Sequence, residues 1–199
     1  MSKQPWDYYS ELTPDRLSVI AVALLDVYDE VQVDLSTPLD SPYTRGTTTF
    51  GRQKTKLIQL CQSDVYHWLD LRNTSNDLVC AIGRVPFRFF RDEHTAPRKK
   101  AFWRRNEQDN LFPVNDDEPV YWRFVIESPL TESDEATAYF LGHNASQQLV
   151  CEWKYAEAVR ALHTTDSARP VEVPTPEPEV ELPQPAIANP KPAGNGEPK

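Results

Sequence analysis

The stretch LTPDRLSVIAVALLDVYDEV, residues 12–31, predicts the first long helix of the chain. Thr13 has the side chain of a helix N-cap, Pro14 suits the first helical position, and Asp15 complements the positive end of the helix dipole. Apolar residues then recur at helical spacing, at Leu17, Ile20, Ala21, Leu24, Tyr28 and Val31. Acidic residues occupy the opposite side, at Asp26, Asp29 and Glu30. We therefore expect an amphipathic helix that buries one side in a core.

The segment after this helix predicts a loop and then a second helix. Prolines, Gly46 and a run of threonines favour a loop from Asp34 onwards. A second helix is expected to begin near Phe50 and to run past Cys61. Its predicted buried stripe consists of Leu57, Ile58, Cys61 and Val65.

Apolar runs with strand-like composition follow the second helix. The runs 66–73 and 78–90 are separated by the turn-type sequence TSND, residues 120–128 alternate in polarity, and the runs 136–144 and 148–156 flank ASQ as a hairpin. There is no internal repeat and no alternation of strands with helices. The expected fold class is α+β, with two N-terminal helices packed on a mainly antiparallel sheet of about five strands.

The chain is predicted to form a single α+β domain, residues 1–165, followed by a tail. A short helix over 156–163 would close the domain. Residues 166–199 contain nine of the eighteen prolines and no aromatic residue, so we expect a disordered Pro/Glu-rich tail. Such a tail would be a tether or a docking peptide for a partner domain. The lack of a signal-like N-terminus and of an apolar run of ~20 residues predicts a cytoplasmic protein with no membrane partner.

Positive charge is concentrated in the middle of this acidic chain. The net charge is −9, yet residues 45–105 hold thirteen Lys or Arg against five Asp or Glu. Residues 1–44 and 106–165 are both strongly acidic. Two stretches carry the positive excess, 45–56 and 84–105, and aromatic residues interrupt the second.

This pattern is typical of a surface that binds a polyanion, because cations contact phosphate or carboxylate groups while aromatic rings stack or anchor. The candidate binding residues are Arg45, Arg52, Lys54, Lys56, Arg84, Arg88, Arg91, Arg98, Lys99, Lys100, Phe102, Trp103, Arg104 and Arg105. If 84–91 is a strand, Arg84, Arg88 and Phe90 share one face and Val85, Phe87 and Phe89 the other. Pro86 would then favour an edge strand or a bulge.

The leading hypothesis is a non-enzymatic binding or adaptor protein whose partner is nucleic acid or the acidic face of another protein. A second hypothesis is an acidic inhibitor or antitoxin-like protein that blocks a basic partner, which the net charge of −9 would suit. The alternative without a binding function is that the basic region neutralises acidic segments of the same fold.

A nuclease is a further hypothesis. Glu152 and Lys154 lie on the same face of a predicted strand, as a carboxylate that holds Mg²⁺ and a lysine that positions water would. This spacing resembles the second half of the PD-(D/E)xK nuclease motif. The resemblance implies an upstream acid at the start of a strand. Asp117 and Glu118 are the nearest candidates, but no PD dipeptide occurs there.

No cofactor is predicted. The chain has no P-loop, no dinucleotide fingerprint and no G-x-S-x-G sequence. Its cysteines, at 61, 80 and 151, form no CxxC pair, and its four histidines lack a ligand spacing. We therefore expect neither a disulfide framework nor a metal site, and each cysteine is predicted to be a small buried apolar group.

Overall fold

The computed structural model describes residues 3–104, 118–129 and 134–156 of the 199-residue chain. The helices are α1 (Pro5–Tyr8), α2 (Pro14–Asp34), α3 (Pro42–Cys61) and the short 3-10 helix η1 (Lys100–Trp103). The strands are β1 (Leu69–Asn73), β2 (Val79–Ile82), β3 (Val85–Arg91), β4 (Tyr121–Glu127), β5 (Thr137–His143) and β6 (Leu149–Lys154). The predicted α+β class is confirmed, with six strands in the sheet instead of about five.

The first predicted helix is confirmed as α2. The hydroxyl of Thr13 accepts a hydrogen bond from the backbone N–H of Arg16 at 3.4 Å, as an N-cap does. All six residues of the predicted apolar stripe are buried. The helix packs against α3 and against β4 and β5, so its apolar side lies in the main core.

The second helix, α3, begins earlier than predicted. Its N-cap is Ser41, whose hydroxyl accepts from the N–H of Thr44 at 3.1 Å, and Pro42 is the first helical residue. The threonine run does not break the helix because hydroxyls such as that of Thr49 donate to the carbonyl one turn earlier. Of the predicted stripe, Leu57 is buried and Ile58 and Cys61 are half-buried, but Val65 lies beyond the helix and is exposed.

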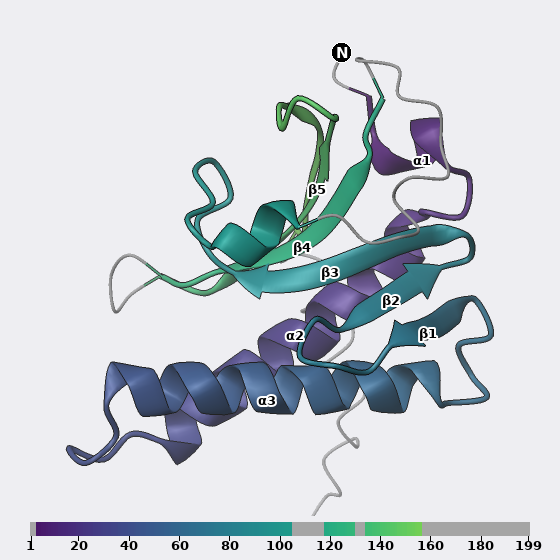
Figure 1. Ribbon diagram of the computed structural model, residues 1–199. Helices are drawn as coiled ribbons and strands as arrows, with labels where there is room; N and C mark the ends of the chain where they lie inside the picture. Colours follow the sequence, from purple (N-terminus) through teal and green to yellow (C-terminus); the bar gives the residue numbers. More distant parts are fainter. Residues whose placement is uncertain (1–2, 105–117, 130–133, 157–199) are drawn as a thin grey trace, which may run out of the picture. The chain divides into compact units, whose positions relative to one another are not determined.

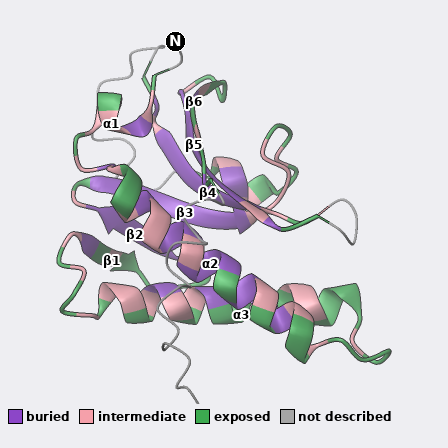
Figure 2. Cartoon of the chain, turned by 180° about the vertical axis from the view of Figure 1, so that it is seen from behind, coloured by how far each residue is buried: buried purple, intermediate pink, exposed green. Residues whose placement is uncertain are grey.

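The sheet has the strand order β1-β2-β3-β4-β5-β6, of which β1–β5 are labelled in Figure 1 and all six strands in Figure 2. All neighbouring pairs are antiparallel except β3 and β4, which run parallel. A parallel pair needs a long crossover connection, and the chain between these two strands contains η1. The prediction of a mainly antiparallel sheet is confirmed, and the one parallel pair was not foreseen.

The expectation of an edge strand at Pro86 is wrong, because β3 pairs with both β2 and β4. The turn at Gly83 and Arg84 joins β2 to β3 as a tight hairpin, with Ile82 opposite Val85 and Ala81 opposite Pro86. Hydrogen-bonded and non-hydrogen-bonded pairs alternate away from such a turn, which puts Pro86 in a non-hydrogen-bonded pair. Pairing with β4 starts only at Phe87, so the missing N–H of the proline interrupts neither ladder.

The two faces of the sheet are covered differently. One face carries alternate residues such as Phe87, Phe89 and Phe124, which pack against α2 and α3 in the main core. The buried positions of Figure 2 concentrate on α2 and the central strands. The opposite face carries a smaller cluster, which consists of Phe90, Phe102, Val125, Tyr139 and Leu141. The predicted alternation is confirmed for residues 85–90. Arg84 lies in the turn before β3 and pairs with Glu11 beside the main core, so its predicted place on the face of Arg88 and Phe90 is wrong.

Two buried arginines hold η1 on this second face. Arg88 and Arg123 are opposite each other in the β3–β4 register, and their side chains are 4% and 0% exposed. Arg123 donates from Nε to the carbonyl of Phe102 at 3.0 Å and from Nη2 to that of Arg104 at 3.3 Å. Arg88 donates from Nη1 to the carbonyl of Ala101 at 3.2 Å. Arg123 thus supplies donors to carbonyls at the end of η1, where intrahelical partners are lacking. The carbonyl of Ala101 accepts both from Arg88 and from the backbone N–H of Arg104.

Two predictions lie outside the described residues: the short helix over 156–163 and the disordered tail over 166–199. The β5–β6 hairpin is confirmed, and Gln147 in its turn has a positive φ of 66°. Within the described ranges, no helix has the length and apolar character needed to cross a membrane.

Candidate functional site

Many of the predicted binding cations are matched by carboxylates of the same chain. Five of them form ion pairs: Arg52 with Asp34, Arg84 with Glu11, Arg88 and Arg104 with Asp77, and Arg98 with Glu93. Most of these pairs are at the surface, where an ion pair contributes little to stability. The alternative that the basic region neutralises the fold's own acids therefore holds for these five residues.

The other predicted cations lie in different places. Arg45 donates to the carbonyls of Leu35 and Asp40 and so fastens the loop between α2 and α3. Lys54 and Lys56 project from α3, and Lys56 borders a groove between α3 and the acidic side of α2. Lys100 is exposed at the start of η1. Arg105 lies outside the described residues.

The two predicted stacking residues belong to the second core. Phe102 is fully buried, and its ring packs against Phe90 at 5.1 Å and Trp103 at 4.8 Å between centroids. Trp103 is half-buried and contacts His143 and Tyr121. In this arrangement Phe102 has no surface to offer a base. Its burial follows from its role as the side chain by which η1 covers the sheet.

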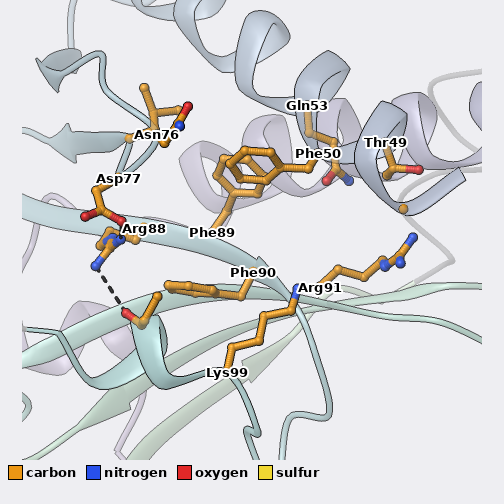
Figure 3. Close-up of a pocket in the computed structure, with 13 residues that line it drawn as sticks. Thr49, Phe50, Gln53, Asn76, Asp77, Arg88, Phe89, Phe90, Arg91 and Lys99 are labelled. Atoms are coloured by element: carbon orange, nitrogen blue, oxygen red, sulfur yellow. Dashed lines mark hydrogen bonds and ion pairs between the residues drawn. The ribbon is translucent and has the colours of Figure 1, made fainter. Parts of the chain in front are cut away.

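Part of the predicted surface nevertheless converges on a cavity of about 220 Å³, which we call the basic cleft (Figure 3). Three regions form its walls: the first half of α3, the turn before β2, and the end of β3 with the segment that follows it. Its lining includes Thr49, Phe50, Gln53, Asp77, Arg88, Phe89, Phe90, Arg91 and Lys99.

Arg88 and Asp77 form one end of the cleft. Nη2 of Arg88 lies 2.6 Å from Oδ1 of Asp77, and Arg104 contacts the other carboxylate oxygen. Burial acts to raise the pKa of Asp77, but hydrogen bonds and charges from Arg104 and Arg88 outweigh it, so the pKa is lowered. Asp77 is therefore a carboxylate shared by two guanidinium groups, which hold it in place.

Arg91 and Lys99 are the cations that line the cleft without such a partner, because neither forms an ion pair with a residue in the described part of the chain. Arg91 extends towards α3 and reaches Gly46, where a Cβ atom would lie only 2.7 Å from Nη2 (Figure 3). Partial burial lowers the pKa of Lys99. The charge of Asp92 opposes this effect, and the charge of Arg91 adds a smaller contribution in the same direction as burial. An anion bound here would relieve the repulsion between the two cations.

An aromatic wall separates α3 from β3 inside the cleft. The rings of Phe50 and Phe89 are stacked, with centroids 5.4 Å apart and an interplanar angle of 19°. Phe50 is 40% exposed, so part of its ring is open to a ligand. Behind it, the side-chain amide of Gln53 donates to the carbonyl of Leu24 at 2.8 Å. The cleft thus combines an apolar wall with cations at its edge.

A more open and acidic depression adjoins the cleft at Arg91. Here Nδ1 of His94 lies 2.7 Å from Oε2 of Glu127, and the imidazole ring stacks on Tyr139 at 4.0 Å. In the described part of the chain, no group of three or more His, Cys, Asp or Glu side chains is arranged to hold a metal ion.

The residues of the nuclease hypothesis are on the last strand of the sheet. Glu152 and Lys154 are both exposed on β6, on one face as predicted. The ammonium of Lys154 lies over the ring of Tyr139, 5.7 Å from its centroid. Of the acids offered as upstream partners, Glu118 is exposed before β4 and Asp117 lies outside the described residues.

Sequence reasoning missed the residues that the turn before β2 and α3 bring to the cleft. Asp77 belongs to the TSND turn, which we interpreted only as a break between strands, and Phe50 was interpreted only as a helix start. The strand alternation at 84–91 did place Arg88 and Phe90 on one face. No local signal indicated that α3 would lie beside the end of β3.

The chain matches no protein-family model, no curated protein and no solved structure. The function therefore has to be inferred from the geometry of this chain.

Proposed function

We propose that the protein is a non-enzymatic, cytoplasmic binding protein that captures an acidic segment of a partner protein at the basic cleft. The observation that supports this is that two cations, Arg91 and Lys99, line the same cavity as the stacked rings of Phe50 and Phe89, and that the ring of Phe50 is partly exposed. These two cations come from the predicted region 84–105, and they are the members of it that line the cavity without forming an ion pair to a carboxylate in the described part of the chain.

The size of the cleft argues for a side chain as the inserted group. A cavity of about 220 Å³ is smaller than the ~300–1,000 Å³ of typical small-molecule pockets. A glutamate or aspartate next to an apolar residue would place its carboxylate between Arg91 and Lys99 and its apolar neighbour against Phe50.

The same features favour an acidic protein over nucleic acid. Binding along a phosphate backbone needs a stripe of available cations and rings on which bases stack. Here five of the candidate arginines are already paired within the chain and Phe102 is buried. The net charge of −9 does not prevent local attraction, because charges beyond ~8 Å are largely screened at physiological salt.

The experiment uses the whole protein and a fluorescein-labelled oligoglutamate peptide that contains one phenylalanine. We expect salt-sensitive binding by fluorescence anisotropy. The double variant Arg91→Glu/Lys99→Glu should weaken it roughly tenfold or more, because two attractive charges become repulsive. The matched control is Lys56→Glu/Arg72→Glu, which changes the net charge equally at positions that do not line the cleft, and it should alter binding little.

Four outcomes would overturn the proposal. The peptide could fail to bind the wild-type protein at low salt, or both double variants could weaken binding equally, which would indicate diffuse attraction. A glutamine version of the peptide that binds as well would exclude recognition of carboxylates. If single-stranded DNA binds instead, with the same dependence on Arg91 and Lys99, the partner is nucleic acid and the acidic-protein form is wrong. Circular dichroism of both variants controls for folding.

A further inference from the structure

Two cysteines that are distant in the sequence are neighbours in the fold. Cys61 is the last residue of α3 and Cys80 lies in β2, with Sγ atoms 3.7 Å apart and in hydrogen-bonding contact. The third cysteine, Cys151, is buried in β6, on the far side of the sheet order from β2. All three are free thiols.

The two neighbouring thiols differ in access and in acidity. Cys61 is half-buried, whereas Cys80 is 1% exposed in the main core. A hydrogen bond from the Cys80 thiol stabilises the Cys61 thiolate and lowers the pKa of Cys61, although burial acts in the opposite direction. The same contact, together with burial, raises the pKa of Cys80. The accessible thiol of the pair is therefore also the one that ionises first, and the thiolate is the reactive form.

We propose that Cys61 and Cys80 form a dithiol modification site that a low-molecular-weight disulfide, such as oxidised glutathione, converts reversibly into an intramolecular disulfide. The Cys61 thiolate attacks one sulfur of the oxidised glutathione, which forms a mixed disulfide and releases one glutathione thiolate. Cys80 then transfers its proton to that thiolate, and its Sγ attacks Sγ of Cys61 and displaces the second glutathione. The two cysteines lose two electrons in total, and one glutathione disulfide is reduced to two thiols.

The geometry favours the second step over a lasting mixed disulfide. The glutathionyl group on Cys61 has to point towards solvent, because the other side of Cys61 faces the core. Cys80 then lies behind the sulfur under attack, opposite the leaving group. Bond formation brings the sulfurs from 3.7 Å to the ~2.0 Å of a disulfide, and Cys61 is at a helix end, where the backbone adjusts most easily.

The test is a peptide map of the native whole protein after treatment with oxidised glutathione. Trypsin cleavage after Lys56, Arg72 and Arg84 puts Cys61 and Cys80 on two adjacent peptides, 57–72 and 73–84. We expect these peptides to be recovered as a disulfide-linked pair, two hydrogen atoms lighter than their sum, which dithiothreitol separates. Cys151 should remain a thiol and serves as the internal control. The oxidised protein should also melt at a higher temperature, since a cross-link restricts the unfolded chain.

Single variants separate the two steps. In Cys80→Ser we expect a stable glutathione adduct on Cys61, because the resolving thiol is gone. In Cys61→Ser we expect no adduct on Cys80 while the protein is folded. The proposal is overturned if native wild-type protein accumulates the Cys61 adduct without the cross-link, if it forms only disulfides between molecules, or if neither cysteine reacts. Thermal melting of each variant shows whether it is folded. If a variant is not folded, the peptide map of the wild-type protein alone tests the proposal.

Discussion

The two faces of the sheet are closed by different means. On one face, α2 and α3 bury aromatic and aliphatic side chains in a continuous core, in which Phe124 and Phe140 are fully buried. On the other face, a helix of only four residues packs its Phe102 against four buried side chains of the sheet and is held by Arg88 and Arg123. The first face is covered through the burial of apolar side chains under two long helices. The cover of the second face is also held by hydrogen bonds from Arg88 and Arg123 to its backbone carbonyls.

This difference indicates where a binding site can form. The margin between α3, which covers the first face, and η1, which covers the second, is left open beside the end of β3. The basic cleft lies at that margin, where Arg88 holds Ala101 on one side and Arg91 reaches α3 on the other. The buried arginine is therefore both part of the cover and part of the cleft.

The largest expected effect comes from truncating adjacent residues of β5 that point to opposite faces. Phe140→Ala removes a ring from the helix-covered core and should lower the free energy of unfolding by about 3–5 kcal/mol. Leu141→Ala on the other face should cost less, about 2–3 kcal/mol, because a four-residue cover can settle into the space left. Urea unfolding of both variants measures the difference. Equal losses would mean that the short cover is as rigid as the helices.

The second expected effect concerns the arginines. Arg123→Met deprives the carbonyls of Phe102 and Arg104 of their donors and should cost about 2–4 kcal/mol, with faster amide hydrogen exchange over residues 99–104. Arg88→Met should cost less, about 1–2 kcal/mol, because Asp77 keeps Arg104 as a partner. Exposed Arg72 provides the control, since Arg72→Met should change stability by under ~0.5 kcal/mol. Wild-type stability in Arg123→Met would show that water or other donors replace the guanidinium.

The smallest expected effect is a pH dependence confined to the second face. Burial and then the charge of Arg123 lower the pKa of His143 to about 4 from 6.5. Between these values the unfolded chain binds more protons than the folded one, so stability falls as the pH falls from about 6.5 towards 4. The two pKa values set an upper bound of about 3–4 kcal/mol on this loss.

Comparing wild type with His143→Phe isolates this contribution. The difference in unfolding free energy between the two proteins should shift in favour of the variant as the pH is lowered through this range. Asp77 and other carboxyl groups lose their ion pairs at lower pH in both proteins, so the subtraction removes them. Parallel stability curves for the two proteins would contradict the assignment.

Local patterns predicted what local physics determines. The cap at Thr13 and the stripe along α2 follow from helical periodicity, and the two faces of β3 follow from strand alternation. The start of α3 was misplaced because the Ser41–Pro42 signal lies in a segment whose threonines favour a loop until their hydroxyls find carbonyl partners in the helix.

The basic cleft and the thiol pair could not be predicted because they depend on which segments meet. Their parts come from α3, β2, β3 and the chain after it, and no periodicity encodes that meeting. Composition did indicate that residues 84–105 are unusually cationic. It could not separate Arg88, which is held by Asp77, from Arg91 and Lys99, which are not.

The single parallel pair of strands has a consequence for how the chain folds. Every other neighbouring pair in the sheet runs antiparallel. The parallel pairing of Phe87 with Trp122 forms only when the whole connection between β3 and β4 is closed into a loop. Closing so long a loop costs chain entropy before any contact compensates for it. We therefore expect β1–β3 with the helices and β4–β6 to gather as two halves, and the joining of these halves along one seam to set the folding rate.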